Sequence, residues 1–261
     1  MATIHSYSLG TPCWFELGTT DQTAAKNFYG QLFGWEAQDS PMGPGEFYTM
    51  FQLGGRTAGA AYTLPRRVLD QGVPPRWTVY FATPNVDASA AEVVELGGAL
   101  VQPPFDVLDV GRMANCQDPG GAAFALWQAK RHAGAEVINE INSICWSELA
   151  TWDTDQAREF YAQLFAWETQ PSENMETYIE FSTDGQERGG LLPMDESWKG
   201  MPSQWGVYVR VADCDATAAR AKQLGATIRY GPFDAPGVGR MALLGDPQGA
   251  GFSIIQLGSA G

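Results

Sequence analysis

The chain repeats itself about 130 residues apart, and this duplication constrains its fold more than any other feature. Residues 13–17 (CWFEL) return as residues 145–149 (CWSEL), 132 positions later. Residues 111–114 (GRMA) return unchanged as residues 239–242, 128 positions later. Internal repeats indicate repeated structural units, so we expect two copies of one fold. A residue kept in both copies also has a stronger claim to a role than one that occurs once.

The length fits this interpretation. A chain of 261 residues divides into two halves of ordinary domain size, and the period is far longer than that of solenoid repeats. We therefore predict one domain over residues 8–130 and a second over residues 142–258. A linker over residues 131–141 would join them.

Hydrophobic patterning predicts an α+β fold in which each copy has the order βαβββ twice. A short strand opens each copy, and strand alternation puts Trp14 and Glu16 on one face of it. Thr19 with Gln22 fits a capping box for the first helix, and Asp87 is expected to cap the second. The elements expected in the first copy are strands at 12–18, 47–53, 57–64, 77–83, 99–105, 111–117 and 122–128, and helices at 21–33 and 88–96. In the second copy we expect a strand at 144–150 and helices near 153–165 and 215–224.

The charge balance is strongly acidic, with 30 acidic against 16 basic side chains and a net charge of −14. Such a surface repels nucleic acid and anionic membranes and attracts cations, although it also serves solubility alone. Neither a signal peptide nor an apolar run long enough to span a bilayer is present, so we expect a cytoplasmic protein. The four cysteines show no disulfide or zinc spacing.

Three motifs resemble a known family when taken together, in order and in both halves. They are the helical Phe28-Tyr29 followed by Leu-Phe-Gly-Trp, an aromatic strand leading into a Val-Asp-Ala helix, and a final hairpin opened by Asp118-Pro119. The chain resembles the glyoxalase / bleomycin-resistance / extradiol-dioxygenase (vicinal oxygen chelate) superfamily, in particular its tandem two-domain glyoxalase-like or hydroxylase-labelled members. The resemblance implies paired βαβββ modules that curl into cup-shaped mixed sheets, each able to hold a ligand.

The metal enzymes of that superfamily bind their ion through His or Glu at four sheet positions. The resemblance places three of these positions at residues without ligand chemistry, and the fourth falls within 59–62 and 189–192, which hold no ligand either. The residues at the first three are Trp14, Trp77 and Ala125 in one copy and Trp146, Trp205 and Ser253 in the other. The two histidines, His5 and His132, lie outside the predicted cup strands. We therefore expect neither a metal nor a cofactor.

Four tryptophans stand where the metal ligands would be: Trp14, Trp77, Trp146 and Trp205. Indole faces hold planar or cationic molecules by stacking and cation–π attraction, so we take these residues as candidates for ligand binding. The alternative is that they fill the cups as ordinary core.

Glu16 and Glu148 each follow a cup tryptophan by two residues and therefore share its face. Partial burial raises the pKa of a carboxyl group towards the range of a catalytic base, and a carboxylate also neutralises a bound cation. The alternative is a buried glutamate satisfied by a backbone amide or by Arg112 or Arg240. Those arginines recur in both copies and are candidates for binding a ligand carboxylate, or structural partners of an acid at the sheet edge.

Two functions remain open from the sequence. The first is a metal-independent small-molecule-binding protein that holds an aromatic or cationic compound, such as an antibiotic or a toxic metabolite. The second is an enzyme, either a glyoxalase-like lyase or isomerase or a hydroxylase of the oxygenase type, with Glu16 or Glu148 as a base. The expected partner is a small molecule, and the expected state is a monomer or a homodimer. The connections 65–75 and 193–204 are long enough to cover the cup mouths.

Overall fold

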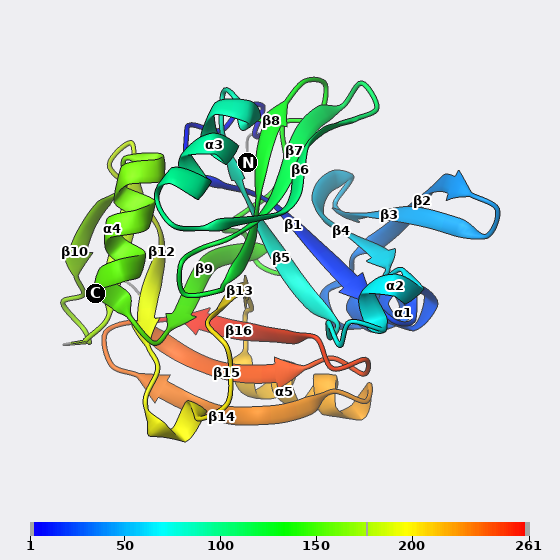
Figure 1. Ribbon diagram of the computed structural model, residues 1–261. Helices are drawn as coiled ribbons and strands as arrows, with labels where there is room; N and C mark the ends of the chain where they lie inside the picture. Colours follow the sequence, from blue (N-terminus) through cyan, green and yellow to red (C-terminus); the bar gives the residue numbers. More distant parts are fainter. Residues whose placement is uncertain (1–2, 176, 259–261) are drawn as a thin grey trace.

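The computed structural model describes residues 3–175 and 177–258, which form two eight-stranded sheets with helices packed against them (Figure 1). Sheet 1 consists of β1–β8 and sheet 2 of β9–β16, so each copy of the sequence repeat builds one sheet. The predicted α+β class and the tandem arrangement are confirmed.

The first copy contains eight strands and three helices. Its strands are β1 (Pro12–Thr19), β2 (Glu36–Gly43), β3 (Glu46–Leu53), β4 (Arg56–Thr63), β5 (Arg76–Ala82), β6 (Ala99–Val107), β7 (Gly111–Gln117) and β8 (Ala123–Ala129). Its helices are α1 (Gln22–Phe33), α2 (Arg66–Leu69) and α3 (Val86–Glu95). The short α2 lies in the Pro-rich connection before β5.

The second copy repeats this order. Its strands are β9 (Ile144–Thr151), β10 (Glu168–Pro171), β11 (Ile179–Thr183), β12 (Gln186–Pro193), β13 (Gln204–Arg210), β14 (Thr227–Ala235), β15 (Gly239–Gly245) and β16 (Gly251–Leu257). Its helices are α4 (Thr154–Phe165) and α5 (Cys214–Gln223), with a 3-10 turn at Glu196–Trp198 where the first copy has α2.

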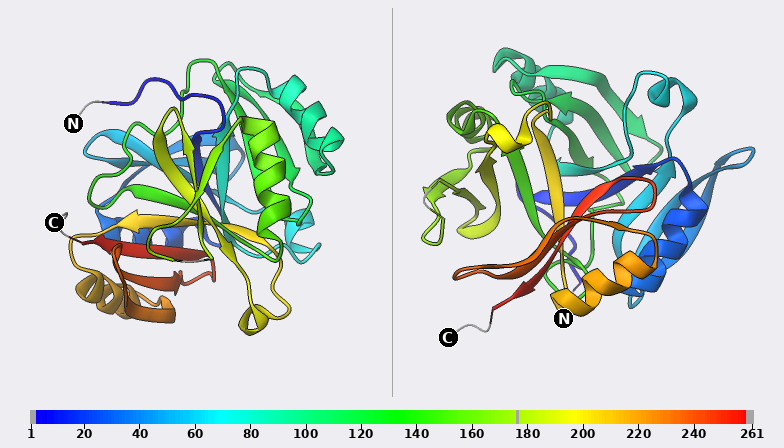
Figure 2. Two further views of the ribbon diagram at one scale, coloured as in Figure 1. Left: turned by 90° about the vertical axis from the view of Figure 1, so that its left-hand side faces the viewer. Right: turned by 90° about the horizontal axis from the view of Figure 1, so that it is seen from below.

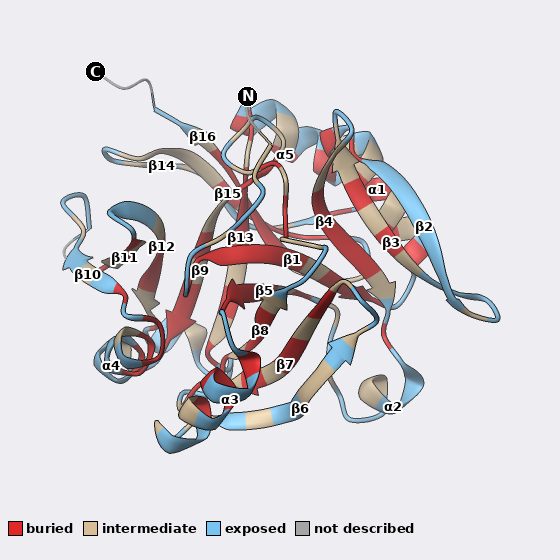
Figure 3. Cartoon of the chain, turned by 90° about the horizontal axis from the view of Figure 1, so that it is seen from above, coloured by how far each residue is buried: buried red, intermediate tan, exposed pale blue. Residues whose placement is uncertain are grey.

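Each sheet joins two βαβββ modules through their first strands. The strand order in sheet 1 is β2-β3-β4-β1-β5-β8-β7-β6, and β1 pairs antiparallel with β5 at the centre. Sheet 2 has the matching order β10-β11-β12-β9-β13-β16-β15-β14. The central strands are buried, whereas β2 and β6 form exposed edges (Figure 3). The centre of each sheet is therefore the protected place for a site.

The helix caps differ from the prediction. Asp21 caps α1, because its carboxylate accepts a hydrogen bond from the Ala24 amide at 2.9 Å, so the Thr19 capping box is wrong. Asn85 caps α3 in the same way at 3.1 Å, while Asp87 lies two residues further on, in the first turn of the helix. Both residues are short polar side chains with extended backbone, which is the geometry that a cap requires. Asp87 is thereby free to bind another partner.

The two domains share one aromatic core. Tyr29 of α1 packs against Phe252 of β16, and Tyr161 of α4 packs against Phe124 of β8. The helices also pair across the domains, α1 with α5 and α3 with α4 (Figure 2). Because α1 and α4 pack against their own sheet and also contact a strand of the other one, they connect the two sheets.

Two reciprocal hydrogen bonds cross this core. The Tyr29 hydroxyl donates to Asp246 and the Tyr161 hydroxyl donates to Asp118, each at 3.0 Å. Both aspartates also accept hydrogen bonds from the backbone of their own turns, as expected for residues before proline. The turns therefore serve as inter-domain contacts as well.

The segment between the sheets, residues 130–143, forms no helix although its composition permits one. It runs instead across the starts of two strands of sheet 1. The Ala135 amide donates to the Cys13 carbonyl and the Glu136 amide to the Thr57 carbonyl, both at 2.7 Å. The linker is thus part of the first domain's wall. Within the described residues, no helix is both long enough and apolar enough to cross a membrane.

Candidate functional site

Each sheet carries one glutamate at the centre of the face that points away from the shared core. In sheet 1, Glu16 lies between Ala60 of β4 and Thr78 of β5. In sheet 2, Glu148 lies between Gly190 of β12 and Gly206 of β13. We call the face around Glu16 cup 1 and the face around Glu148 cup 2. The predicted placement of both glutamates beside a cup tryptophan agrees with this register.

In cup 1, two tyrosines hold the glutamate. The Tyr48 hydroxyl donates to Glu16 Oε1 at 2.8 Å, and the Tyr80 hydroxyl donates to Glu16 Oε2 at 2.7 Å. The indole N–H of Trp14 in turn donates to the Tyr48 hydroxyl at 3.1 Å. The chain of donors therefore runs from the indole through Tyr48 to the carboxylate, which also accepts a hydrogen bond from Tyr80.

Cup 2 repeats the cluster. Tyr178 donates to Glu148 Oε2 at 3.0 Å and Tyr208 donates to Glu148 Oε1 at 2.8 Å. The Trp146 indole donates to the Tyr178 hydroxyl at 2.8 Å. The same four residue types thus meet in the same order in both domains, although the repeat tolerated many other changes.

The charge of each glutamate is balanced by neutral donors alone. Among the described residues, neither Glu16 nor Glu148 forms an ion pair. Burial raises the pKa of Glu16, and the hydrogen bonds from Tyr80 and Tyr48 oppose that rise. Burial likewise raises the pKa of Glu148 against the hydrogen bonds of its two tyrosines. A partly desolvated carboxylate of this kind attracts a cation or takes up a proton.

Sequence reasoning missed the four tyrosines. Tyr80 and Tyr208 stand 128 positions apart, and Tyr48 and Tyr178 stand 130 apart. The comparison of the two copies would have found both pairs, because each tyrosine is kept. Their strands, however, lie on both sides of the glutamate strand, and only the sheet order brings them together.

Trp77 and Trp205 lie on the opposite side of their sheets from the glutamates. Trp77 is 4% exposed, and its indole donates to the Tyr29 hydroxyl at 3.1 Å. Trp205 is 6% exposed and donates to the Tyr161 hydroxyl at 2.9 Å. Both belong to the shared core, so the expectation that they line the cups is not met. Strand alternation puts the next residues, Thr78 and Gly206, in the cups instead.

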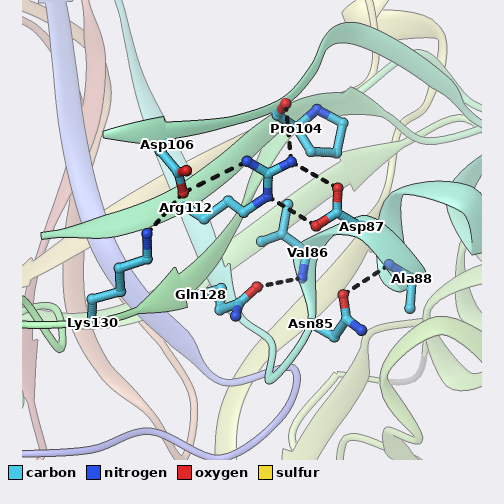
Figure 4. Close-up of polar contacts among 9 residues, drawn as sticks. All are labelled: Asn85, Val86, Asp87, Ala88, Pro104, Asp106, Arg112, Gln128 and Lys130. Carbon is cyan, nitrogen blue, oxygen red and sulfur yellow. Dashed lines mark hydrogen bonds and ion pairs between the residues drawn. The ribbon is translucent and has the colours of Figure 1, made fainter. Parts of the chain in front are cut away.

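Arg112 and Arg240 bind acids at the outer edge of each sheet. Arg112 donates to Asp87 of α3 at 2.8 Å and approaches Asp106 of β6 at 3.6 Å (Figure 4). Arg240 pairs in the same manner with Asp215 and Asp234. The structure therefore does not bring either arginine to a glutamate, and the alternative of structural partners for acids describes their positions.

His132 contacts cup 1, although the linker in which it lies was expected to be outside the cups. Its ring meets the Trp14 ring edge to face, with centroids 4.4 Å apart, and its carbonyl accepts a hydrogen bond from the Trp127 indole at 2.9 Å. Its Nε2 atom is buried without a partner among the described residues. Burial lowers the pKa of His132, and Glu136 opposes that change. The ring thus packs against the tryptophan of cup 1.

The residues around the glutamates do not fit a metal ion. The described part of the chain contains no group of three or more His, Cys, Asp or Glu side chains that could hold one. Divalent ions in proteins require several such ligands, whereas Glu16 is flanked by Ala60, Thr78 and Trp14. The chemistry of both cups is therefore that of one carboxylate among aromatic hydroxyls.

Two family descriptions match the chain in tandem. The one for the glyoxalase/bleomycin resistance protein/dioxygenase superfamily matches residues 12–126, and one for a glyoxalase-like domain matches residues 146–255. "Putative glyoxylase CFP32" from Mycobacterium bovis is 42% identical over 253 residues, which span 96% of both chains. "Anthracycline biosynthesis protein DnrV" from Streptomyces peucetius is 37% identical over 270 residues, spanning 96% of this chain and 94% of the relative.

Solved structures share the fold at low sequence identity. A Mn(II)-bound glyoxalase from Novosphingobium aromaticivorans superposes with a TM-score of 0.63 at 16% identity, covering 96% of this chain and 85% of that one. A variant of homoprotocatechuate 2,3-dioxygenase from B. fuscum superposes with a TM-score of 0.66 at 16% identity, covering 98% and 72%. At this identity, the similarity extends to the fold alone.

Proposed function

Because the chain belongs to the glyoxalase/bleomycin resistance protein/dioxygenase superfamily, we propose that it is a metal-independent binding protein for a small aromatic or cationic compound. The compound would be held in the cups, against the carboxylate of Glu16 or Glu148. Trp14 and Trp146 would form part of the wall. This use of the cups differs from the metal chemistry named for some structural neighbours, since the cup residues here lack a ligand set.

One observation carries the proposal, namely the glutamate that two tyrosines hold in each cup without a cationic partner. Removing a carboxylate from water is unfavourable unless another group compensates its charge. Tyrosine hydroxyls compensate part of it and leave room for a full positive charge. A ligand cation between the carboxylate and the aromatic rings would supply the rest through charge-assisted hydrogen bonds and cation–π attraction.

The aromatic half of the proposal rests on the rings that surround each glutamate. Tyr48 and Tyr80 donate to Glu16 in cup 1, and Trp14 donates to Tyr48; their twins make the same contacts in cup 2. Rings of this kind stack on planar ligands. The names of DnrV and of the similar DauV place those relatives in anthracycline biosynthesis, which adds planar polycyclic compounds to the range worth testing.

A binding screen tests the proposal. Purified protein is titrated with a panel of aromatic amines, polycyclic antibiotics and uncharged aromatic metabolites, and quenching of tryptophan fluorescence is followed, with calorimetry for compounds that absorb. We expect saturable binding of at least one aromatic or cationic compound by protein that contains no stoichiometric metal in elemental analysis. The proposal is refuted if no compound binds, or if a stoichiometric transition metal is required for binding.

A second candidate is an acid–base enzyme at the same carboxylates, a lyase or isomerase of the glyoxalase type. The raised pKa of Glu16 and Glu148 favours it, since a proton acceptor works best when its pKa is near the working pH. The name of the mycobacterial relative points in the same direction. In that case a Glu148→Gln or Glu16→Gln variant would lose turnover of a bound carbonyl compound. Full activity in the double variant would remove this candidate.

A further inference from the structure

The two cups share their tyrosines and glutamate but differ in the residues beside the glutamate. On one side, Glu16 has Thr78 of β5 as its paired neighbour, whereas Glu148 has Gly206 of β13. Paired residues on neighbouring strands point to the same face of a sheet. A side chain therefore stands beside the carboxylate in cup 1, and none stands there in cup 2.

The space above Gly206 is open. A Cβ atom added at Gly206 would meet only the backbone oxygen of Glu148, at 3.8 Å, which is ordinary van der Waals contact. The other glycine beside Glu148 differs, because a Cβ atom at Gly190 would overlap with the ring of Tyr178. Gly190 thus makes room for a tyrosine that belongs to the cluster, while a Cβ atom at Gly206 would have no close neighbour.

The cups also differ at the end where the tryptophan lies. Trp14 is 3% exposed and packs against the His132 ring, whereas Trp146 is half-buried. Among the described residues, no aromatic ring pairs with Trp146. The residue 128 positions after His132 is Ala260, which lies outside the described residues and has no ring to offer. Trp146 therefore presents indole surface that Trp14 does not.

From these differences we propose that cup 2 is the main ligand site, and that an ammonium group of the ligand lies over Gly206 against the carboxylate of Glu148. The inference rests on the proposed function and narrows it to organic cations in one cup. An apolar or aromatic part of the ligand would extend towards Trp146. The assigned class is an amine or a quaternary ammonium compound that carries an aromatic ring.

The chemistry of cup 2 suits this ligand. Each oxygen of Glu148 accepts one tyrosine hydrogen bond, from Tyr208 or Tyr178, and a carboxylate oxygen has a second lone-pair direction available for an N–H donor. The two phenol rings and the Trp146 indole attract a cation through their faces or edges at short range. A neutral alcohol of the same shape would gain neither the charge pairing nor the cation–π attraction.

The test exchanges the two residues that distinguish the cups. Gly206→Thr and Thr78→Gly each give one cup the neighbour that the other has, and neither alters the glutamate or its tyrosines. Threonine suits a strand, and its Cβ atom at residue 206 would meet no close atom, so the variant should fold. Calorimetry measures binding of 2-phenylethylamine to the wild type and to both variants, with 2-phenylethanol as the uncharged control. Thermal melts verify that the variants are folded.

We expect the wild type to bind the amine at least ten times more tightly than the alcohol, and Gly206→Thr to weaken amine binding at least tenfold. Thr78→Gly should leave amine binding in cup 2 unchanged. The inference is overturned if the amine fails to bind, if the alcohol binds as well, or if folded Gly206→Thr keeps full affinity. Binding of another panel compound that is insensitive to Gly206→Thr would overturn the inference while leaving the proposed function intact.

Discussion

Cup 1 and cup 2 contain the same tryptophan–tyrosine–glutamate cluster in different surroundings. In cup 1 the linker covers the end beside Trp14 with His132, and Thr78 stands next to the glutamate. In cup 2 the tryptophan is half-buried, and Gly206 leaves open space beside the glutamate. The duplication thus preserved the cluster and changed the residues beside it.

This difference has a physical origin in the connection between the copies. The linker has to leave sheet 1 at β8 and reach β9, and it does so by pairing with the starts of β1 and β4 through Cys13 and Thr57. That path carries His132 against Trp14. In our proposal, cup 1 has a mainly structural role and cup 2 binds the ligand.

The largest difference in ligand affinity is expected between the variants Glu148→Gln and Glu16→Gln. A hydrogen bond to a charged partner contributes about 1.5–3 kcal/mol. Glu148→Gln should therefore weaken binding of a cationic ligand by about 10- to 150-fold. Glu16→Gln should change it by less than about threefold, because the Thr78 side chain stands beside the glutamate of cup 1. Calorimetric titration of both variants with 2-phenylethylamine measures the contrast, and equal losses would show that the cups do not differ in use.

A second contrast concerns the tyrosines. Gly190→Ala places a methyl group where the Tyr178 ring lies, so the ring must move away from Glu148. Overpacking of this kind costs about 1–3 kcal/mol, and the ligand site should be lost with it. The matched change in cup 1, Ala60→Gly, should cost only about 0.5–1 kcal/mol through backbone entropy. Urea denaturation and ligand titration of both variants test this, and an unchanged affinity in Gly190→Ala would contradict it.

The pH dependence of binding should follow the carboxylate of cup 2. Because burial raises the pKa of Glu148 above its ordinary 4.5, the carboxylate takes up a proton before an exposed glutamate does. Cation binding should accordingly weaken as the pH falls through that raised pKa towards 4.5. The glutamate's own effect on stability has the opposite sign: the protein loses stability as the pH rises through the same raised pKa. Titrations from neutral pH downwards should show the loss of affinity in the wild type at a pH above the ordinary pKa of a glutamate, and a flat profile in Glu148→Gln.

The smallest expected effect is the opening of cup 1. His132→Ala removes the ring that covers Trp14, and we expect a stability loss of about 1–2 kcal/mol together with a red shift of tryptophan emission. Burial lowers the pKa of His132 below 6.5, so the folded wild type favours the neutral ring. The contribution of His132 to the free energy of unfolding is therefore lost as the pH falls from 6.5 through that lowered pKa. NMR titration distinguishes His132 from His5, the only other histidine. A His132 pKa above 6.5 would contradict the packing described for it.

Much of the fold was predictable from the sequence, because the duplication indicates two copies of one structural unit. Local hydrophobic patterns predict the strand that carries Glu16 and the alternation of its side chains between the two faces. The sequence repeat then predicts the same strand in the second copy. The site was only half predictable. The two glutamates and Trp14 and Trp146 share one strand, so local periodicity suffices to place them together.

The remaining site residues depend on contacts that are distant in the sequence. Tyr80 reaches Glu16 because β5 pairs with β1 in a register that sets Thr78 opposite Glu16 and Tyr80 opposite Trp14. The resemblance to metal enzymes placed Trp77 in the cup, whereas this register pairs Trp77 with Leu17 on the other face. His132 depends on the path of a linker without regular structure, which no periodicity describes. The partners of Arg112 and Arg240 could not be predicted, because an acidic partner could lie on either face of the sheet.

The most direct test of the difference between the cups is to follow two indole N–H resonances during a ligand titration. Trp14 and Trp146 are assigned by Trp14→Phe and Trp146→Phe variants, and the protein is titrated with 2-phenylethylamine. If cup 2 is the ligand site, the Trp146 resonance shifts with saturation while the Trp14 resonance stays in place. A saturable shift of Trp14, or no shift of Trp146 on binding, would contradict the account.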